Sequence, residues 1–190
     1  MIPLAHLRRV LPLVVLATTG PARAAGAGFG AGNTALMTFT WEGAGPVGDL
    51  RTTKLVDSVS PAGAAGDMRL LLGAHTTLGV ALAWNHFTGA NQAIVNTLAP
   101  RLVAHWYLSQ SRVQPYLGVG AGAVWTSTAV AGNPCQHAWG GCVDPQLGLL
   151  ITVAQELALD LHVRYSYTTA STGSLNNYQW IAVGAGFGLY

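Results

Sequence analysis

The stretch QPYLGVGAGAVW, residues 114–125, alternates bulky apolar residues with glycine. A β-strand places successive side chains on opposite faces. One face of this stretch therefore carries Leu117, Val119, Ala121, Ala123 and Trp125, and the other carries Gly118, Gly120 and Gly122. The segment QWIAVGAGFGLY, residues 179–190, repeats the pattern, with Gly184, Gly186 and Gly188 on its glycine face. In water such an apolar face requires a packed core behind it, whereas in a bilayer it can contact acyl chains.

Six further segments show the same alternation, which makes eight candidate strands in total. They are residues 33–42, 67–75, 78–87, 99–109, 146–156 and 157–168, with Leu71 and Leu150 out of pattern. Connections after the second, fourth and sixth strands are short, and the others are longer, as in outer-membrane barrels. The expected lipid-facing positions include aromatic residues near strand ends, namely Trp41, Trp84, Trp106, Trp125, Tyr165 and Tyr167. The pattern predicts an all-β fold, a transmembrane antiparallel up-and-down β-barrel of eight strands.

The composition favours a membrane environment over a soluble one. Charged residues make up 8% of the sequence and hydrophobic residues 51%. Past the N-terminal leader no unbroken apolar run reaches the length of a membrane-spanning helix, which excludes transmembrane helices by pattern. A soluble β-sandwich is the alternative, but strands lined by glycine or alanine make poor water-facing surfaces.

Residues 1–24 have the features of a secretory signal peptide. Arg8 and Arg9 precede a short apolar core, and Ala22-Arg23-Ala24 is an A-x-A cleavage site. A retained membrane anchor is the alternative, although the apolar run is too short to span a bilayer. We expect residues 25–190 to form a single domain. Without the three leader arginines, six basic and seven acidic residues give a net charge of −1, and their scattered placement excludes nucleic acid as a partner.

A resemblance to a known family rests on four features of the sequence. These are the leader, the eight strands, and the segments PYLGVGAGA (residues 115–123) and VGAGFGLY (residues 183–190). The chain resembles the small outer-membrane β-barrel proteins of Gram-negative bacteria, including the transmembrane domain of outer-membrane protein A and the W-type barrels. The resemblance implies an outer-membrane location, periplasmic termini, contact with lipid and lipopolysaccharide, and assembly through the C-terminal strand. In that family the final aromatic residue faces lipid, whereas Tyr190 shares the parity of the glycine face.

Charged residues gather on the expected inward faces of the strands. This predicted lumen network comprises Asp67, Arg69, Arg101, His105, Glu156, Asp160, His162 and Arg164. Buried charges must be paired or hydrated, so a structural network that fills a narrow lumen is one interpretation. A gated polar pathway for small solutes is the other. The two glycine faces either border a void or receive a bulky side chain such as Tyr107 or Tyr116.

Cys135 and Cys142 fall in the expected loop between the fifth and sixth strands. An even pair in an oxidising compartment predicts a disulfide. Metal binding by Cys135, His137 and Cys142 is the alternative, but it lacks a fourth ligand. We therefore expect no metal and no cofactor.

The sequence favours a barrel with a structural or surface-interaction role and no catalytic residues. A narrow porin-like channel for small, including apolar, solutes is the first alternative, and the loops offer a place for an extracellular ligand. A lipid A-modifying enzyme is the second alternative. Residues 164–169 faintly resemble the strand that carries the His-x-Ser pair of lipid A deacylase barrels, but Tyr167 stands where the histidine would be. His162 and Ser166 share a face of one strand but lie about 13 Å apart.

Overall fold

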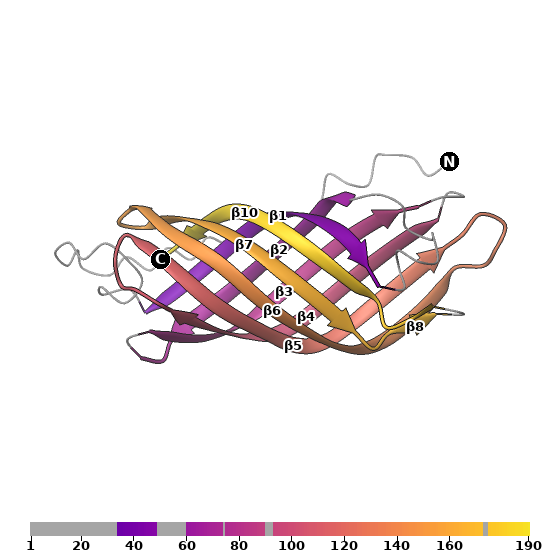
Figure 1. The fold of residues 1–190 in the computed structure, drawn as a ribbon, viewed down its shortest axis with the longest axis horizontal. Helices are drawn as coiled ribbons and strands as arrows, with labels where there is room; N and C mark the ends of the chain where they lie inside the picture. Colours follow the sequence, from indigo (N-terminus) through magenta and orange to yellow (C-terminus); the bar gives the residue numbers. More distant parts are fainter. Residues whose placement is uncertain (1–33, 49–59, 74, 90–92, 173–174) are drawn as a thin grey trace, which may run out of the picture.

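The computed structural model describes residues 34–190, apart from 49–59, 74, 90–92 and 173–174. Within these residues, eight antiparallel strands form a closed barrel in which every strand pairs with its neighbours in sequence and β1 pairs with β10 (Figure 1). The barrel strands are β1 (Ala35–Val47), β2 (Ser60–Leu71), β3 (Thr76–Thr88), β4 (Ile94–Tyr107), β5 (Val113–Ala129), β6 (Gln136–Ala154), β7 (Leu157–Thr168) and β10 (Gln179–Leu189). The short strands β8 (Ser171–Thr172) and β9 (Leu175–Asn176) pair with each other. The predicted fold class is confirmed.

Several strand boundaries differ from the sequence prediction: β1 ends at Val47 and not at 42, and β4 begins at Ile94 and not at 99. β6 begins at Gln136, ten residues before the predicted start at 146, because it stays paired with β5 out to Thr128. β2 covers Ser60–Leu71, so it begins seven residues before the predicted strand 67–75 and ends four residues before the end of that strand. By contrast, β7 has the predicted bounds.

The connections divide into a loop end and a turn end of the barrel. The turn end holds the connections that follow β2, β4 and β6, together with the C-terminus (Figure 1). The loop end holds the connections that follow β1, β3, β5 and β7. The long connections after β1 and β7 fit the predicted alternation of connection lengths. The connection after β3, residues 89–93, does not fit it, because it has the same length as the connection after β4, residues 108–112. Among the described residues, no helix is long and apolar enough to cross a membrane.

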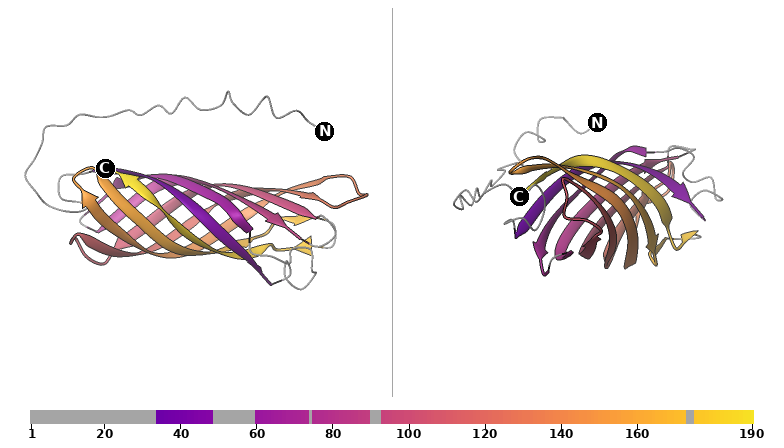
Figure 2. Two further views of the ribbon diagram at one scale, coloured as in Figure 1. Left: turned by 90° about the horizontal axis from the view of Figure 1, so that it is seen from above. Right: turned by 60° about the vertical axis from the view of Figure 1, so that its left-hand side comes forward.

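The stagger of the strands sets their tilt. Following the paired residues from Trp41 through β2, β3, β4 and β5 leads to Trp139 in β6. Following them the other way, through β10 and β7, leads to Leu149, ten residues further along the same strand. With about 3.3 Å per residue and about 4.8 Å between strands, this stagger corresponds to a strand tilt of about 40°. Figure 2 shows the steeply inclined strands.

The outer wall is apolar over its whole circumference. All the exposed large hydrophobic side chains in the barrel strands lie on the outward face of their strand, from Met37 in β1 to Leu189 in β10. We call this surface the lipid-facing belt. Such a belt would be insoluble in water but matches the acyl chains of a bilayer, which is the environment that the sequence pattern predicts.

The lumen is filled by three layers of side chains. A loop-end cluster of apolar residues includes Phe87, Val95, Val124, Tyr178 and Trp180. A turn-end cluster comprises Leu36, Tyr107, Tyr116, Leu150 and Ala158, with Leu71 and Tyr190 packed against it. Leu71 and Leu150, out of pattern in the sequence, are therefore inward residues that close the turn end. The charged side chains lie between the two clusters.

Candidate functional site in the lumen

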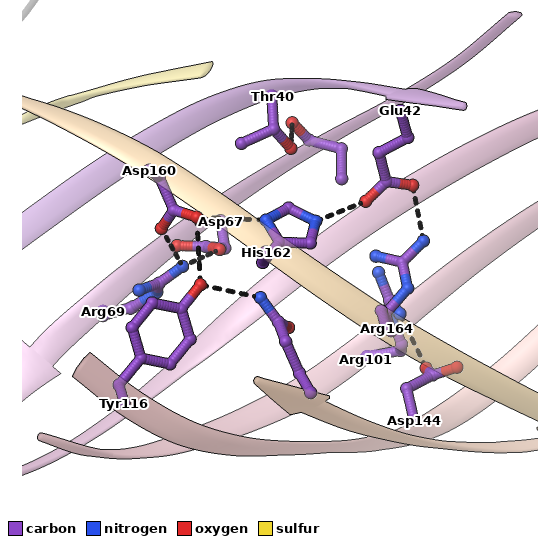
Figure 3. Close-up of polar contacts among 12 residues, drawn as sticks. Thr40, Glu42, Asp67, Arg69, Arg101, Tyr116, Asp144, Asp160, His162 and Arg164 are labelled. Atoms are coloured by element: carbon purple, nitrogen blue, oxygen red, sulfur yellow. Dashed lines mark hydrogen bonds and ion pairs between the residues drawn. The ribbon is translucent and has the colours of Figure 1, made fainter. Parts of the chain in front are cut away.

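The loop-side half of the charged layer consists of two buried ion pairs. Arg164 in β7 donates to the Glu42 carboxylate in β1, with Nη2 2.6 Å from Oε2. Arg101 in β4 donates to Asp144 in β6, with Nη1 2.6 Å from Oδ2. All four side chains are at most 3% exposed, so each charge depends on its partner rather than on bulk water (Figure 3).

The turn-side half is centred on Arg69 of β2. Its Nη2 lies 2.7 Å from Asp67 Oδ2 and 3.3 Å from Asp160 Oδ2. Its Nη1 donates to the Tyr107 hydroxyl at 3.0 Å, and the guanidinium carbon lies 5.4 Å from the centre of the Tyr116 ring. The Tyr116 hydroxyl donates to Asp160 Oδ1 at 2.9 Å. This half therefore holds two carboxylates against one guanidinium.

His162 joins the two halves. Its Nδ1 lies 3.0 Å from Asp160 Oδ1 and its Nε2 lies 3.0 Å from Glu42 Oε1 (Figure 3). An ionised carboxylate only accepts hydrogen bonds, so two such contacts require a proton on each ring nitrogen. With both carboxylates ionised, His162 is an imidazolium. The described lumen then balances four carboxylates against three guanidiniums and one imidazolium, and it carries no net charge.

Two aromatic rings occupy space that the glycine faces leave open, and a third covers a glycine of β6. A Cβ atom on Gly118 would lie 2.6 Å from the His105 ring, and one on Gly184 would lie 2.5 Å from the His162 ring. The Tyr116 ring covers Gly148 in the same way. Of the two interpretations of the glycine faces, the structure thus shows side-chain insertion at Gly118 and Gly184, by histidine rings and not by the predicted Tyr107 or Tyr116.

The other predicted glycines have different neighbours. Gly122 and Gly186 lie against the backbone of an adjacent strand, at Pro100 and Phe39 respectively. A Cβ on Gly188 would lie 2.9 Å from the Leu36 side chain, whereas one on Gly120 would make ordinary contacts at 3.5 Å. Among the described residues, a cavity of about 10 Å³ lies between the charged side chains, lined in part by Asp67, Asp144 and Gln146. This is about the space of one water molecule.

Most of the predicted lumen residues come together. Asp67, Arg69, Arg101, Asp160, His162 and Arg164 all take part in the ion pairs. His105 also lies in the lumen, where its ring meets the Tyr116 ring edge-on with centroids 5.1 Å apart. The prediction for Glu156 is wrong. It is exposed in the two-residue turn between β6 and β7, because β6 ends at Ala154.

Two acidic partners were not in the predicted network. Glu42 lies at a position that alternation along its strand places on the inward face, and this alternation alone would have placed it in the predicted lumen network. Asp144 was assigned to a loop because the sixth strand was expected to begin two residues later. Its pairing with Arg101 depends on the alignment of β4, β5 and β6, which no local pattern reveals.

Cys135 and Cys142 are free thiols in the structure, which contradicts the predicted disulfide. Cys142 lies within β6 with a buried side chain, and Cys135 directly precedes the strand and is exposed. Seven residues of extended chain separate the two by about 23 Å, far beyond the reach of a disulfide. Among the described residues no cluster of His, Cys, Asp and Glu could hold a metal ion.

The arrangement does not form a nucleophile and base pair. Both nitrogens of His162 contact carboxylates, and the Ser166 hydroxyl is buried with no hydrogen-bond partner among the described residues. A serine nucleophile requires a histidine within hydrogen-bond reach, and His162 does not supply it to Ser166.

Comparison of the sequence with protein-family models and with curated proteins finds no match. Solved structures do match. Neisserial surface protein A has a TM-score of 0.61 at 15% identity, over 82% of this chain and 95% of that protein. Outer-membrane protein AlkL has a TM-score of 0.53 at 18% identity, over 90% and 94%. OprG of Pseudomonas aeruginosa has a TM-score of 0.50 at 14% identity, over 82% and 95%. At these identities the likeness shows the fold, which is that of the small eight-stranded outer-membrane β-barrels.

Proposed function

We propose that this membrane β-barrel is an occluded structural barrel of the outer membrane, which acts through its wall and its loop-end surface and has no catalytic activity. The observation that carries this proposal is the filled lumen. Apolar clusters close both ends, and the charged layer between them leaves a cavity of about 10 Å³. Among the described residues, the cavity in the charged layer has room for about one water molecule, which favours an occluded lumen.

A narrow pore is the alternative, and the contacts in the lumen oppose it. Opening the barrel would require Phe87 and Trp180 to separate at one end and Tyr107 and Tyr116 at the other. It would also break ion pairs whose members are buried, and removing one partner of such a pair costs about 3 to 5 kcal/mol. The two large hollows, of about 590 and 710 Å³, are grooves lined mainly by residues of the lipid-facing belt rather than of the lumen.

The same proposal includes an orientation and partners. In outer-membrane barrels short turns face the periplasm, so we place the turn end and both termini there. The lipid-facing belt would contact outer-membrane lipid and lipopolysaccharide, and the last strand would be presented to the assembly machinery. Tyr190 points into the lumen, where its hydroxyl lies 2.9 Å from Thr152 Oγ1. The lipid-facing residues that the machinery could read are therefore Phe187 and Leu189.

Planar-bilayer recording tests the occlusion. The folded protein, with insertion verified by protease protection of the reconstituted barrel, should give no conductance steps at either polarity. Reproducible conductance steps from the wild-type protein would show that the barrel is an open pore and would refute the proposed occlusion.

Mass spectrometry of lipid A tests the absence of catalysis. Cells that express the protein should show the same lipid A masses as cells that carry the empty vector. A species that is present only with the wild-type protein would establish a lipid-modifying activity.

A further inference from the structure

The loop-end rim of the barrel has a step between β6 and β7. β6 is paired with β5 out to Gln136, but it is paired with β7 only as far as the pair of Cys142 and Thr168. Among the described residues, residues 136–140 therefore have a neighbouring barrel strand on one side only. A step is expected in a staggered barrel, because paired positions climb along the wall and cannot meet at one height where it closes. Figures 1 and 2 show the β5–β6 hairpin projecting beyond the rest of the barrel.

Gly140 and Gly141 mark the place where the chain after β7 leaves the barrel wall. Thr169 N donates to the Gly141 carbonyl oxygen at 2.9 Å, which extends the pairing of β6 and β7 by one residue. The next residue, Ala170, lies against Gly140, where an added Cβ would be 2.3 Å from Ala170 N. Ala170 is fully buried in the loop-end cluster. The chain therefore turns inward at Ala170, and β8 pairs with β9 rather than with β6.

The backbone contacts of Gly141 identify the groups that are unpaired above the step. Its amide donates to Thr169 Oγ1 at 2.8 Å and its carbonyl accepts from Thr169 N, so both groups point to the β7 side. Backbone orientation alternates along a strand, so His137 and Trp139 direct their amides and carbonyls to the same side. No described residue forms a backbone hydrogen bond with them there. We call these groups of His137 and Trp139 the open edge of β6.

The open edge lies in water and is accessible. Paired positions lead from Trp41 in β1 to Trp139 in β6, and the strand tilt places Trp139 about 15 Å closer to the loop end. An unpaired backbone group inside a bilayer costs several kcal/mol, which also places this edge outside it. The side chains of His137 and Trp139 are both exposed. Residues 136–140 include no proline, lysine or acidic residue, the usual means of blocking an edge strand.

We propose that the open edge of β6 is a docking site for an extended polypeptide segment of another protein, which adds a strand to the barrel wall. Amides and carbonyls at the spacing of a strand are matched by the backbone of a second strand. The side chains beside the edge are uncharged, so main-chain hydrogen bonds hold the segment and salt has little effect on its affinity. This inference rests on the proposed function, because it names the partner of the loop-end surface.

A second copy of the chain in the same membrane does not fit the open edge. Two copies in one membrane are related by a twofold axis along the membrane normal. With strands tilted by about 40°, such an axis would make two β6 strands cross at about 80°. Neighbouring strands of a sheet differ in direction by only about 20 to 25°. The occupant is therefore a segment that is free to align with β6.

Hydrogen exchange of the protein in lipid nanodiscs tests whether the edge is open. The amides of His137 and Trp139 should exchange faster than those of Ala138 and Gly140, which lie opposite Thr126 and Val124 of β5. Equal protection of all four amides would overturn the proposal, because the edge would already be covered. Protection of His137 and Trp139 that disappears on dilution into more lipid would also overturn it, since the occupant would then be a second copy of the chain.

Peptide selection tests the docking itself. A phage library of random peptides is panned against the barrel in nanodiscs, with empty nanodiscs as the background. His137→Pro removes one amide of the open edge and leaves the amides that face β5, so it should weaken binding of the selected peptides about tenfold. His137→Ala keeps that amide, so its affinity for the peptides should stay close to that of the wild type.

Two outcomes of the selection would overturn the proposal. One is the absence of enrichment over empty nanodiscs, and the other is equal binding of the selected peptides to the wild type and to His137→Pro. Exchange of the Ala138 and Gly140 amides shows whether the hairpin of the proline variant is intact, and Trp139→Pro with Trp139→Ala repeats the comparison if it is not. Conductance steps would refute the occluded lumen without changing these results, so the two proposals fail separately.

Discussion

Replacing Glu42 with glutamine should destabilise the barrel strongly, because it removes the one carboxylate that both Arg164 and His162 contact. Glu42 is fully buried, and its two oxygens accept hydrogen bonds at 2.6 Å and 3.0 Å. The substitution keeps the shape. The His162 ring can release its proton in response, but the buried Arg164 guanidinium cannot, so Arg164 is left without its carboxylate, which costs about 3 to 5 kcal/mol. With a denaturant slope of about 2 kcal/mol per molar, the urea midpoint should fall by about 1.5 to 2.5 M.

The assay is urea unfolding of the reconstituted barrel, followed by tryptophan fluorescence. Glu156→Gln is the matched control, because the same chemical change at an exposed turn should alter stability by no more than about 0.5 kcal/mol. The double variant Glu42→Gln/Arg164→Met should lose less than the sum of the single variants, since it removes both members of the pair. A Glu42→Gln cost below about 1 kcal/mol, or strict additivity in the double variant, would refute the assignment of a buried charge network.

Three further outcomes are expected. Gly184→Ala should cost about 1 to 3 kcal/mol in the same assay because its Cβ would displace the His162 ring, whereas Gly73→Ala, with no atom within 4 Å of the added Cβ, should leave the midpoint unchanged. Phe87→Ala should cost about 3 to 5 kcal/mol and weaken the near-ultraviolet circular dichroism of its edge-on neighbour Trp180, and unchanged stability would argue against a packed loop-end cluster. Cys135 should react with a soluble maleimide in the folded barrel, and Cys142 should react only after unfolding. A change in protein mass on reduction would show instead that the two cysteines form a disulfide.

Strands with clean alternation were predictable because each residue's face depends only on its own parity. β7 has its predicted bounds, and its inward Asp160, His162 and Arg164 all reach the lumen. β6 was misjudged because its first ten residues, which include Gly140, Gly141 and Pro145, were assigned to a loop. In the barrel these residues remain in a strand because β5 supplies a hydrogen-bonded partner along their whole length.

The candidate site was predictable only as a set of inward charges. Parity places Arg101 and Asp144 on inward faces, but their 2.6 Å contact requires two intervening strand pairings to be in a particular alignment. The same holds for Glu42 and His162, which lie 120 residues apart in sequence. If one strand were shifted by two residues against its neighbour, every side chain would stay on the same face of its strand. Each would then lie beside a different residue of that neighbour.

The sequence by itself determined that this chain is a barrel and, within the strands whose bounds were predicted correctly, which face is apolar and which points inward, because alternation along a strand is a local property. Tertiary structure alone decided what the lumen contains. Closing eight tilted strands with a ten-residue stagger brings the His105, His162 and Tyr116 rings over glycines of neighbouring strands and places each charge beside its partner. The register between strands depends on residues far apart in the sequence. Residues 114–125 by themselves therefore indicated only a glycine-lined wall, and the pairing with neighbouring strands decided that side chains fill the space beside it.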